Sequence, residues 1–134
     1  MVANGYNPML WDFQRQGCFN KKKRPKIEML SECLPGKIAV SDIDGIIEIS
    51  GNFLVLEFKE HNHIPRGQQI LFQRMTRNKP FFVLIIEADV ETMTVYGVNY
   101  VADGKIEPQR EMDLAGLKKA IAEWSEWAQK NPVR

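Results

Sequence analysis

Hydrophobic and polar residues alternate through residues 41–60, which is the period of a β-strand with one buried face. Gly51 and Asn52 interrupt the alternation with two residues that favour tight turns. The pattern therefore predicts a hairpin of two strands, 41–50 and 53–60.

A second pair of strands is expected further along the chain. Residues 81–87 are nearly all apolar, as in a central strand that is buried on both faces. Residues 92–101 alternate more loosely and are expected to pair with this strand as a second hairpin.

Three other stretches have apolar residues at helical spacing. Pro25 suits the first turn of a short helix that ends at Pro35 and Gly36, Pro65 opens a helix to about Arg77, and Asp113 caps the last helix. Their apolar positions are Ile27, Leu30 and Leu34; Leu71, Phe72 and Met75; and Leu114, Leu117, Ile121, Trp124 and Ala128.

This order of elements predicts an α/β fold with a small central mixed sheet flanked by helices, in the order α-β-β-α-β-β-α. The 134 residues, 44% of them hydrophobic, are expected to form one domain, residues 1–134. Within it we expect an irregular N-terminal arm (1–24), a core (25–101) and a C-terminal helix (108–134).

Composition excludes several protein classes. The longest apolar run is far shorter than the about 20 residues that cross a bilayer, and the N-terminus does not resemble a signal peptide. The two cysteines, Cys18 and Cys33, form neither a disulfide scaffold nor a zinc motif. We therefore expect a cytoplasmic protein with no membrane partner, located in the host cytoplasm if a phage encodes it.

The formal net charge of +1 does not by itself indicate a nucleic-acid partner, but the charge distribution does. Residues 14–26 contain six basic residues and no acidic one. They are Arg15, Lys21, Lys22, Lys23, Arg24 and Lys26. Such a run can hold phosphates, although a solvated lysine-rich arm has the same composition.

Charged residues share one face of the predicted first hairpin. With Gly51 and Asn52 as the turn, residues whose numbers sum to 103 stand opposite each other, so Asp44 faces Lys59 and lies diagonal to Glu57. Two carboxylates about 4 Å apart repel by roughly 4 kcal/mol at an effective dielectric near 20. A hard divalent cation, a proton or the lysine would relieve this repulsion. The alternative is an ordinary solvated strand face.

Asp44, followed after twelve residues by Glu57-Phe58-Lys59, resembles the D…(D/E)xK signature of the PD-(D/E)xK nucleases. This superfamily includes restriction endonucleases, Holliday-junction resolvases and phage recombination nucleases. Its core of helix, hairpin, strand, helix and strand is similar to the order expected for residues 25–101. The resemblance implies a metal-dependent phosphodiesterase that hydrolyses DNA, with Mg²⁺ or Mn²⁺ as its cofactor.

The resemblance also assigns roles to individual residues. Asp44 and Glu57 would ligate the metal, and Lys59 would orient the attacking water and stabilise charge on the phosphate. Glu28 is similar to the acidic residue that some members place on their first helix. Gln69 is similar to the polar residue that the following helix directs to the site.

Two departures from the family pattern leave alternatives open. Ile43 stands where the signature has proline, and Asp42 is an additional acid that competes with Asp44 as the metal ligand. Gln73 shares the helical face of Gln69, so either glutamine could serve.

The implied partner is DNA, and a homodimer would suit the cutting of two strands. The expected phosphate contacts are Lys21, Lys22, Lys23, Arg24, Lys26 and Arg66. With little material for base readout, structure-selective or nonspecific cleavage is expected. The sequence leaves open the choice between DNA and RNA and between endo- and exonuclease. The alternatives are a noncatalytic nucleic-acid-binding module on the same fold and a small phage interaction protein.

Overall fold

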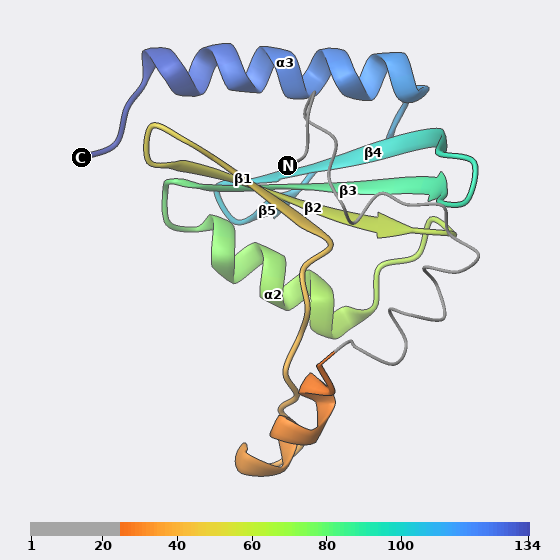
Figure 1. Ribbon diagram of the computed structural model, residues 1–134, viewed down its shortest axis with the longest axis vertical. Helices are drawn as coiled ribbons and strands as arrows, with labels where there is room; N and C mark the ends of the chain where they lie inside the picture. The colour runs from red at the N-terminus through yellow and green to blue at the C-terminus, as the bar shows by residue number, and fades with distance from the viewer. Residues whose placement is uncertain (1–24) are drawn as a thin grey trace. The chain divides into compact units, whose positions relative to one another are not determined.

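The computed structural model describes residues 25–134, so the arm with Lys21, Lys22, Lys23 and Arg24 lies outside the described residues. The chain divides into two compact units, Met1–Asp42 and Ile43–Arg134. The second unit carries the sheet and the helices α2 and α3 (Figure 1). No helix within residues 25–134 has the length and apolar character that spanning a membrane requires.

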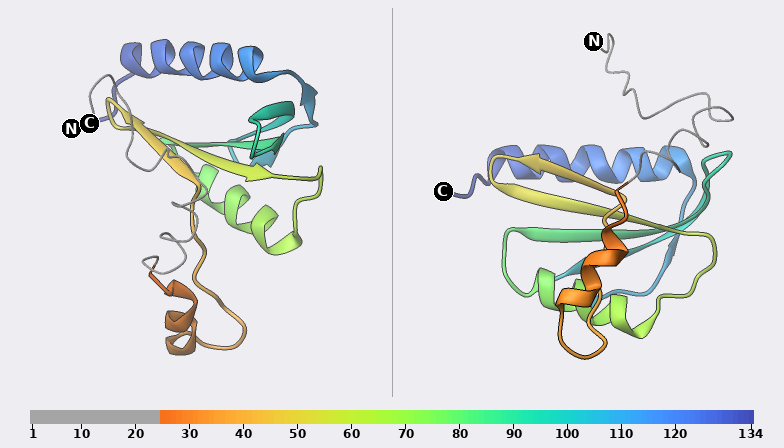
Figure 2. Two further views of the ribbon diagram at one scale, coloured as in Figure 1. Left: turned by 45° about the vertical axis from the view of Figure 1, so that its right-hand side comes forward. Right: turned by 60° about the horizontal axis from the view of Figure 1, so that its bottom comes forward.

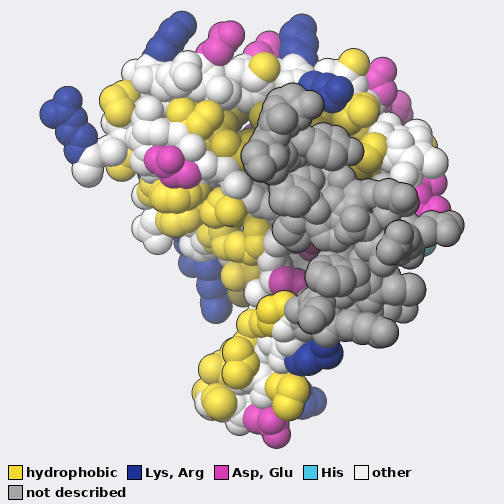
Figure 3. Space-filling view, viewed as in Figure 1, with side chains coloured by type: hydrophobic (Ala, Val, Ile, Leu, Met, Phe, Trp, Pro, Cys, Tyr) yellow, Lys and Arg dark blue, Asp and Glu magenta, His cyan; other side chains and the backbone are white. Residues whose placement is uncertain are grey.

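In the first unit, the helix expected after Pro25 is a 3₁₀-helix, η2 (Ile27–Cys33), and not an α-helix. It contains no buried residue, and hydrophobic side chains lie at the surface of this segment (Figure 3). Met29 and Leu30 are 61% and 57% exposed. Propensity alone rarely sustains a short α-helix in water, so the absence of burial accounts for the tighter, irregular turn.

The predicted hairpin is present as β1 (Gly45–Ile49) and β2 (Asn52–Lys59), but its turn is one residue earlier than predicted. Ser50 and Gly51 form the turn with φ values of +53° and +86°, the left-handed pair that suits a two-residue hairpin. Ile49 pairs with Asn52, so the numbers of opposite residues sum to 101 and not to 103. Because the register differs by two residues, every side chain keeps its predicted face.

Helix α2 (Arg66–Thr76) connects β2 to a parallel neighbour, β3 (Phe81–Asp89). The strand β4 (Thr94–Ala102) then pairs antiparallel with β3. The predicted central strand is confirmed: β3 lies between β2 and β4, and its residues 83–86 are all buried.

Two short strands that the sequence analysis did not predict, β5 (Lys105–Ile106) and β6 (Arg110–Glu111), both pair with β4 and complete a six-stranded mixed sheet. Helix α3 (Leu114–Lys130) follows. The predicted cap is confirmed, since Oδ1 of Asp113 accepts the amide of Gly116 at 2.9 Å. Charged side chains line the outer side of α3 (Figure 3).

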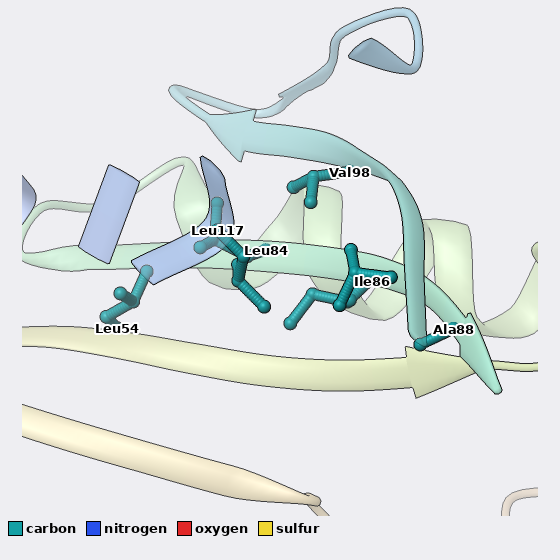
Figure 4. Close-up of a cluster of buried hydrophobic side chains, with 7 residues drawn as sticks. Leu54, Leu84, Ile86, Ala88, Val98 and Leu117 are labelled. Carbon is teal, nitrogen blue, oxygen red and sulfur yellow. The ribbon is translucent and has the colours of Figure 1, made fainter. Parts of the chain in front are cut away.

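The two helices cover opposite faces of the sheet, which confirms the α/β class with helices flanking a mixed sheet (Figure 2). Under α3, the core contains Leu54, Leu84, Ile86, Ala88, Val95, Val98 and Leu117 (Figure 4). Under α2, it contains Val55, Phe72, Val83, Ile85 and Val101. Successive β2 residues therefore point to different cores, and the odd-numbered ones face α2.

Asn52 has a buried role that explains the displaced turn. Its side chain is 2% exposed, and Nδ2 donates to the carbonyl oxygens of Ala128 at 3.4 Å and Asn131 at 2.9 Å. The amide of Val133 also donates to the carbonyl of Ser50 at 2.8 Å. The end of α3 is therefore fastened to the hairpin.

We expect Asn52→Ala to lower the free energy of unfolding by about 1–3 kcal/mol, because the carbonyl oxygen of Asn131 loses this donor and that of Ala128 keeps the amide of Asn131 but loses the amide of Asn52. Urea denaturation monitored by tryptophan fluorescence measures this change. Asn78→Ala, at an exposed position, is the matched control and should stay within about 0.5 kcal/mol of the parent chain. Equal stability of the two variants would contradict an anchoring role for Asn52.

Candidate active site

Strand β2 places Glu57 and Lys59 on the face that α2 covers, since residues two apart on a strand point the same way. Glu57 is buried at 7% exposure, and its Oε2 lies 3.2 Å from Nζ of Lys59. The side chain of Lys59 is itself only 18% exposed. This ion pair is therefore largely shielded from solvent.

Asp44 immediately precedes β1 and lies beside this pair. Extending the observed register by one pair places it opposite Glu57, so the predicted position opposite Lys59 is wrong by the same two-residue shift. Its Oδ2 accepts the backbone amide of Phe58 at 2.8 Å. Beyond Gly45, where the backbone pairing of β1 with β2 ends, the Asp44 carboxylate accepts the β2 amide in place of a backbone carbonyl. This hydrogen bond fixes the position of the Asp44 side chain.

Helix α2 contributes Gln68, whose Nε2 donates to Oε2 of Glu57 at 3.3 Å. The predicted residue, Gln69, instead donates to the carbonyl of Ile64 at 2.7 Å, so it closes the preceding loop. The spacing of residues along the helix could have indicated Gln68 instead of Gln69. Gln68 lies three and four residues before Leu71 and Phe72, which pack against the core, and so it shares their face.

Gln68 also has an oxygen with no partner. Within the described residues, its Oε1 is buried and accepts no hydrogen bond. A buried polar oxygen without a partner is costly, so this position suits a water or ligand that donates to it.

Burial raises the pKa of the Glu57 carboxyl above its ordinary value of 4.5, and the charge of Asp44 raises it further. The hydrogen bond and charge of Lys59 act in the opposite direction, as does the hydrogen bond from Gln68. Lys59 and Gln68 therefore offset only part of the effect of burial and of the Asp44 charge on this pKa.

The adjacent strand adds a carboxylate that the sequence analysis did not assign to the site. Glu87 is the β3 neighbour of Lys59, and its Oε1 accepts Nε2 of Gln109 at 2.8 Å. Gln109 in turn accepts from Asn62 at 3.2 Å and packs directly on Gly97, where a Cβ would lie 2.7 Å from the amide carbon of Gln109. The sequence could have indicated this placement, because Val83, Ile85 and Glu87 alternate along β3 and therefore share one face.

The other expected site residues divide between the two units. Glu28 and Asp42 belong to the first unit, as does Lys26, which precedes η2 and is exposed. Arg66 is exposed at the first position of α2, and no contact of the Gln73 side chain with Glu57 is found in the described part of the chain.

The donor set fits a magnesium-type cation. Across residues 25–134, no three His, Cys, Asp or Glu side chains form a ready-made metal cage. Mg²⁺ typically binds one or two carboxylates and keeps several waters, which suits Asp44 and Glu57. The unpartnered Oε1 of Gln68 is an acceptor for such a water.

Comparison with known proteins adds no relative: the chain matches no family model, no curated protein and no solved structure. The function of the protein is therefore inferred from the geometry and chemistry of these residues.

We expect Glu57→Gln to be more stable than the parent chain at pH 7, because the variant removes a buried charge and keeps an acceptor for Lys59. A carboxyl whose folded pKa is raised favours the folded state below the unfolded value of 4.5, and this advantage is lost as pH rises through the folded pKa. The stability difference between variant and parent should therefore grow with pH from about 4.5 upward. Urea unfolding in metal-free buffer from pH 4 to 8 measures it.

Glu126→Gln, at an exposed position of α3, reports what the loss of one negative charge does by itself. A parent chain that gains stability over Glu57→Gln as the pH rises would contradict the assigned direction of the pKa shift.

Proposed function

We propose that this protein is a metal-dependent nuclease of the PD-(D/E)xK kind that hydrolyses phosphodiester bonds in DNA. The observation that carries the proposal is the shielded Glu57–Lys59 pair with Asp44 beside it at the start of the neighbouring strand. Two carboxylates and one ammonium thus lie at one end of the sheet. This is the arrangement that the D…(D/E)xK resemblance implies.

Asp44 and Glu57 would hold Mg²⁺ or Mn²⁺ through their carboxylate oxygens. When bound, such an ion neutralises charge on the phosphoryl oxygens and lowers the pKa of a coordinated water. Glu57 is held in place by Lys59 and Gln68, and Asp44 by the amide of Phe58, so both ligands are oriented before the ion arrives.

Lys59 would donate to the phosphate oxygen on which negative charge develops. Its low exposure keeps the ammonium poorly solvated, which strengthens this interaction relative to a surface lysine. Glu87, fixed by Gln109, lies on the next strand and would help to keep the side chain of Lys59 extended along the sheet.

Basic side chains outside the cluster would bind the DNA backbone. Lys26 and Arg66 are exposed, and the lysine-rich arm precedes them in the sequence. Contacts of this kind fix the position of a strand without reading its bases, in keeping with structure-selective or nonspecific cleavage.

Millimolar Mn²⁺ should raise the melting temperature of the parent chain, because the ion relieves repulsion between the site carboxylates. At ten times its Kd, binding contributes about 1.4 kcal/mol, or about 3–6 °C for a protein of this size. The shift should be lost in Asp44→Asn and kept in Asp103→Asn, an exposed control. Equal shifts in both variants would place the ion elsewhere.

Purified protein with Mg²⁺ or Mn²⁺ should cleave at least one member of a panel of plasmid, linear duplex, single-stranded, flap and four-way-junction DNA. Lys59→Met should lower kcat by about 10²–10³-fold, as expected for removal of a donor to the developing charge. Lys105→Met, at an exposed position of β5, is the matched control and should cleave normally.

Cleavage that is equal in Lys59→Met and the parent chain would remove Lys59 from the mechanism. Metal-independent DNA binding without cleavage of any substrate, unchanged in Glu57→Gln, would instead identify a noncatalytic binding module.

A further inference from the structure

A hollow opens beside Asp44 at the end of the sheet where β2 and β3 finish. Its volume is about 490 Å³, and it is an open recess of the surface and not an enclosed cavity. The described residues that line it are Asp44, Phe58, Glu60, Val90 and Met93. The turn between β3 and β4 reaches this end of the sheet (Figure 1). Asp44 is the residue that the hollow shares with the candidate active site, because Phe58 points to the α3 face of β2 whereas Glu57 and Lys59 point to the α2 face.

Two apolar side chains of the turn between β3 and β4 are exposed to solvent. Val90 is 45% exposed and Met93 is 38% exposed. Polar contacts hold the turn: Oδ1 of Asp89 accepts the amides of Glu91 at 3.1 Å and Thr92 at 3.4 Å. Its apolar residues are thus available for another partner.

The backbone of Met93 supports this reading. Its φ of +56° is left-handed, which is unfavourable for a residue with a long side chain. Such strain persists where the surrounding structure imposes it, and it is concentrated at ligand-binding positions. Here it holds Met93 at the wall of the hollow beside Phe58 and Val90.

We infer that the hollow receives one unpaired nucleobase of the substrate strand, at the Asp44 end of the candidate site. The inference rests on the proposed nuclease function and specifies its substrate class. Apolar and aromatic side chains bind the face of any base, and a paired base cannot reach such a hollow without leaving its stack. The preferred substrate is therefore DNA with unpaired bases at the cleavage site, such as a single strand or a flap.

Glu60 adds a preference among the bases. An ionised carboxylate only accepts hydrogen bonds, so it can bind the exocyclic amino groups of cytosine, adenine and guanine. Thymine has no such group, and its one N–H donor, at N3, lies between two carbonyl oxygens that the carboxylate repels. We expect a thymine at the hollow to be the least favoured base.

The test compares KM for a single strand and a blunt duplex of the same sequence. Val90→Thr combined with Met93→Asn removes the apolar wall, and asparagine tolerates the left-handed backbone that methionine occupies. In this double variant KM for the single strand should rise about tenfold, the loss expected for one base contact. Val40→Thr, at an exposed valine that does not line the hollow, should leave KM unchanged.

Two further readouts separate a base site from a structural role. Glu60→Gln should reduce the discrimination against thymine in homopolymer cleavage, because an amide also donates. A strand with a single 2-aminopurine should change fluorescence on binding Glu57→Gln, and the double variant in the Glu57→Gln background should lose that change.

The outcomes distinguish this inference from the proposed function. Metal-dependent cleavage that is as efficient on blunt duplex as on single strand, or a KM that the double variant does not alter, overturns the base site and leaves the nuclease. A fluorescence change that depends on Val90 and Met93, without cleavage of any DNA by the parent chain, keeps the base site and overturns the nuclease.

Discussion

The register of β1 against β2 is the constraint on which the candidate site depends. The turn at Ser50 and Gly51 sets it, and the buried side chain of Asn52 prevents the turn from moving one residue along the chain. In this register Asp44 comes opposite Glu57. A two-residue shift would keep the apolar core intact and still separate the two carboxylates, so hydrophobic burial alone does not specify the site.

Glu57 illustrates how the fold concentrates charge. The same strand that delivers Val55 to the core delivers Glu57 two residues later, near the margin of that core, where water is largely excluded. Lys59 and Gln68 stabilise its charged form but do not fully offset burial and the charge of Asp44. A nearby cation would lower the free energy of this partly buried carboxylate. This is the electrostatic basis for the proposed metal-assisted function.

Most of the fold could be predicted from the sequence because periodicity reports burial directly. The apolar run in β3 predicted a buried strand, and the apolar residues at helical spacing in α3 predicted an amphipathic helix. The register could not be predicted, because asparagine is a frequent turn residue and its buried hydrogen bonds to α3 join residues far apart in sequence. The sequence indicated Gln69 or Gln73 and missed Gln68, because successive helical residues differ by about 100° and only packing shows which one faces the sheet. The two-residue strands β5 and β6 are too short for any pattern.

The fastening of α3 to the hairpin links the last residues of the chain to the geometry of the site. Val133 lies over Gly51, where a Cβ would come within 2.6 Å of its carbonyl oxygen, and its amide holds Ser50. A chain shortened at Lys130 would keep both hydrophobic cores but lose this brace on the turn.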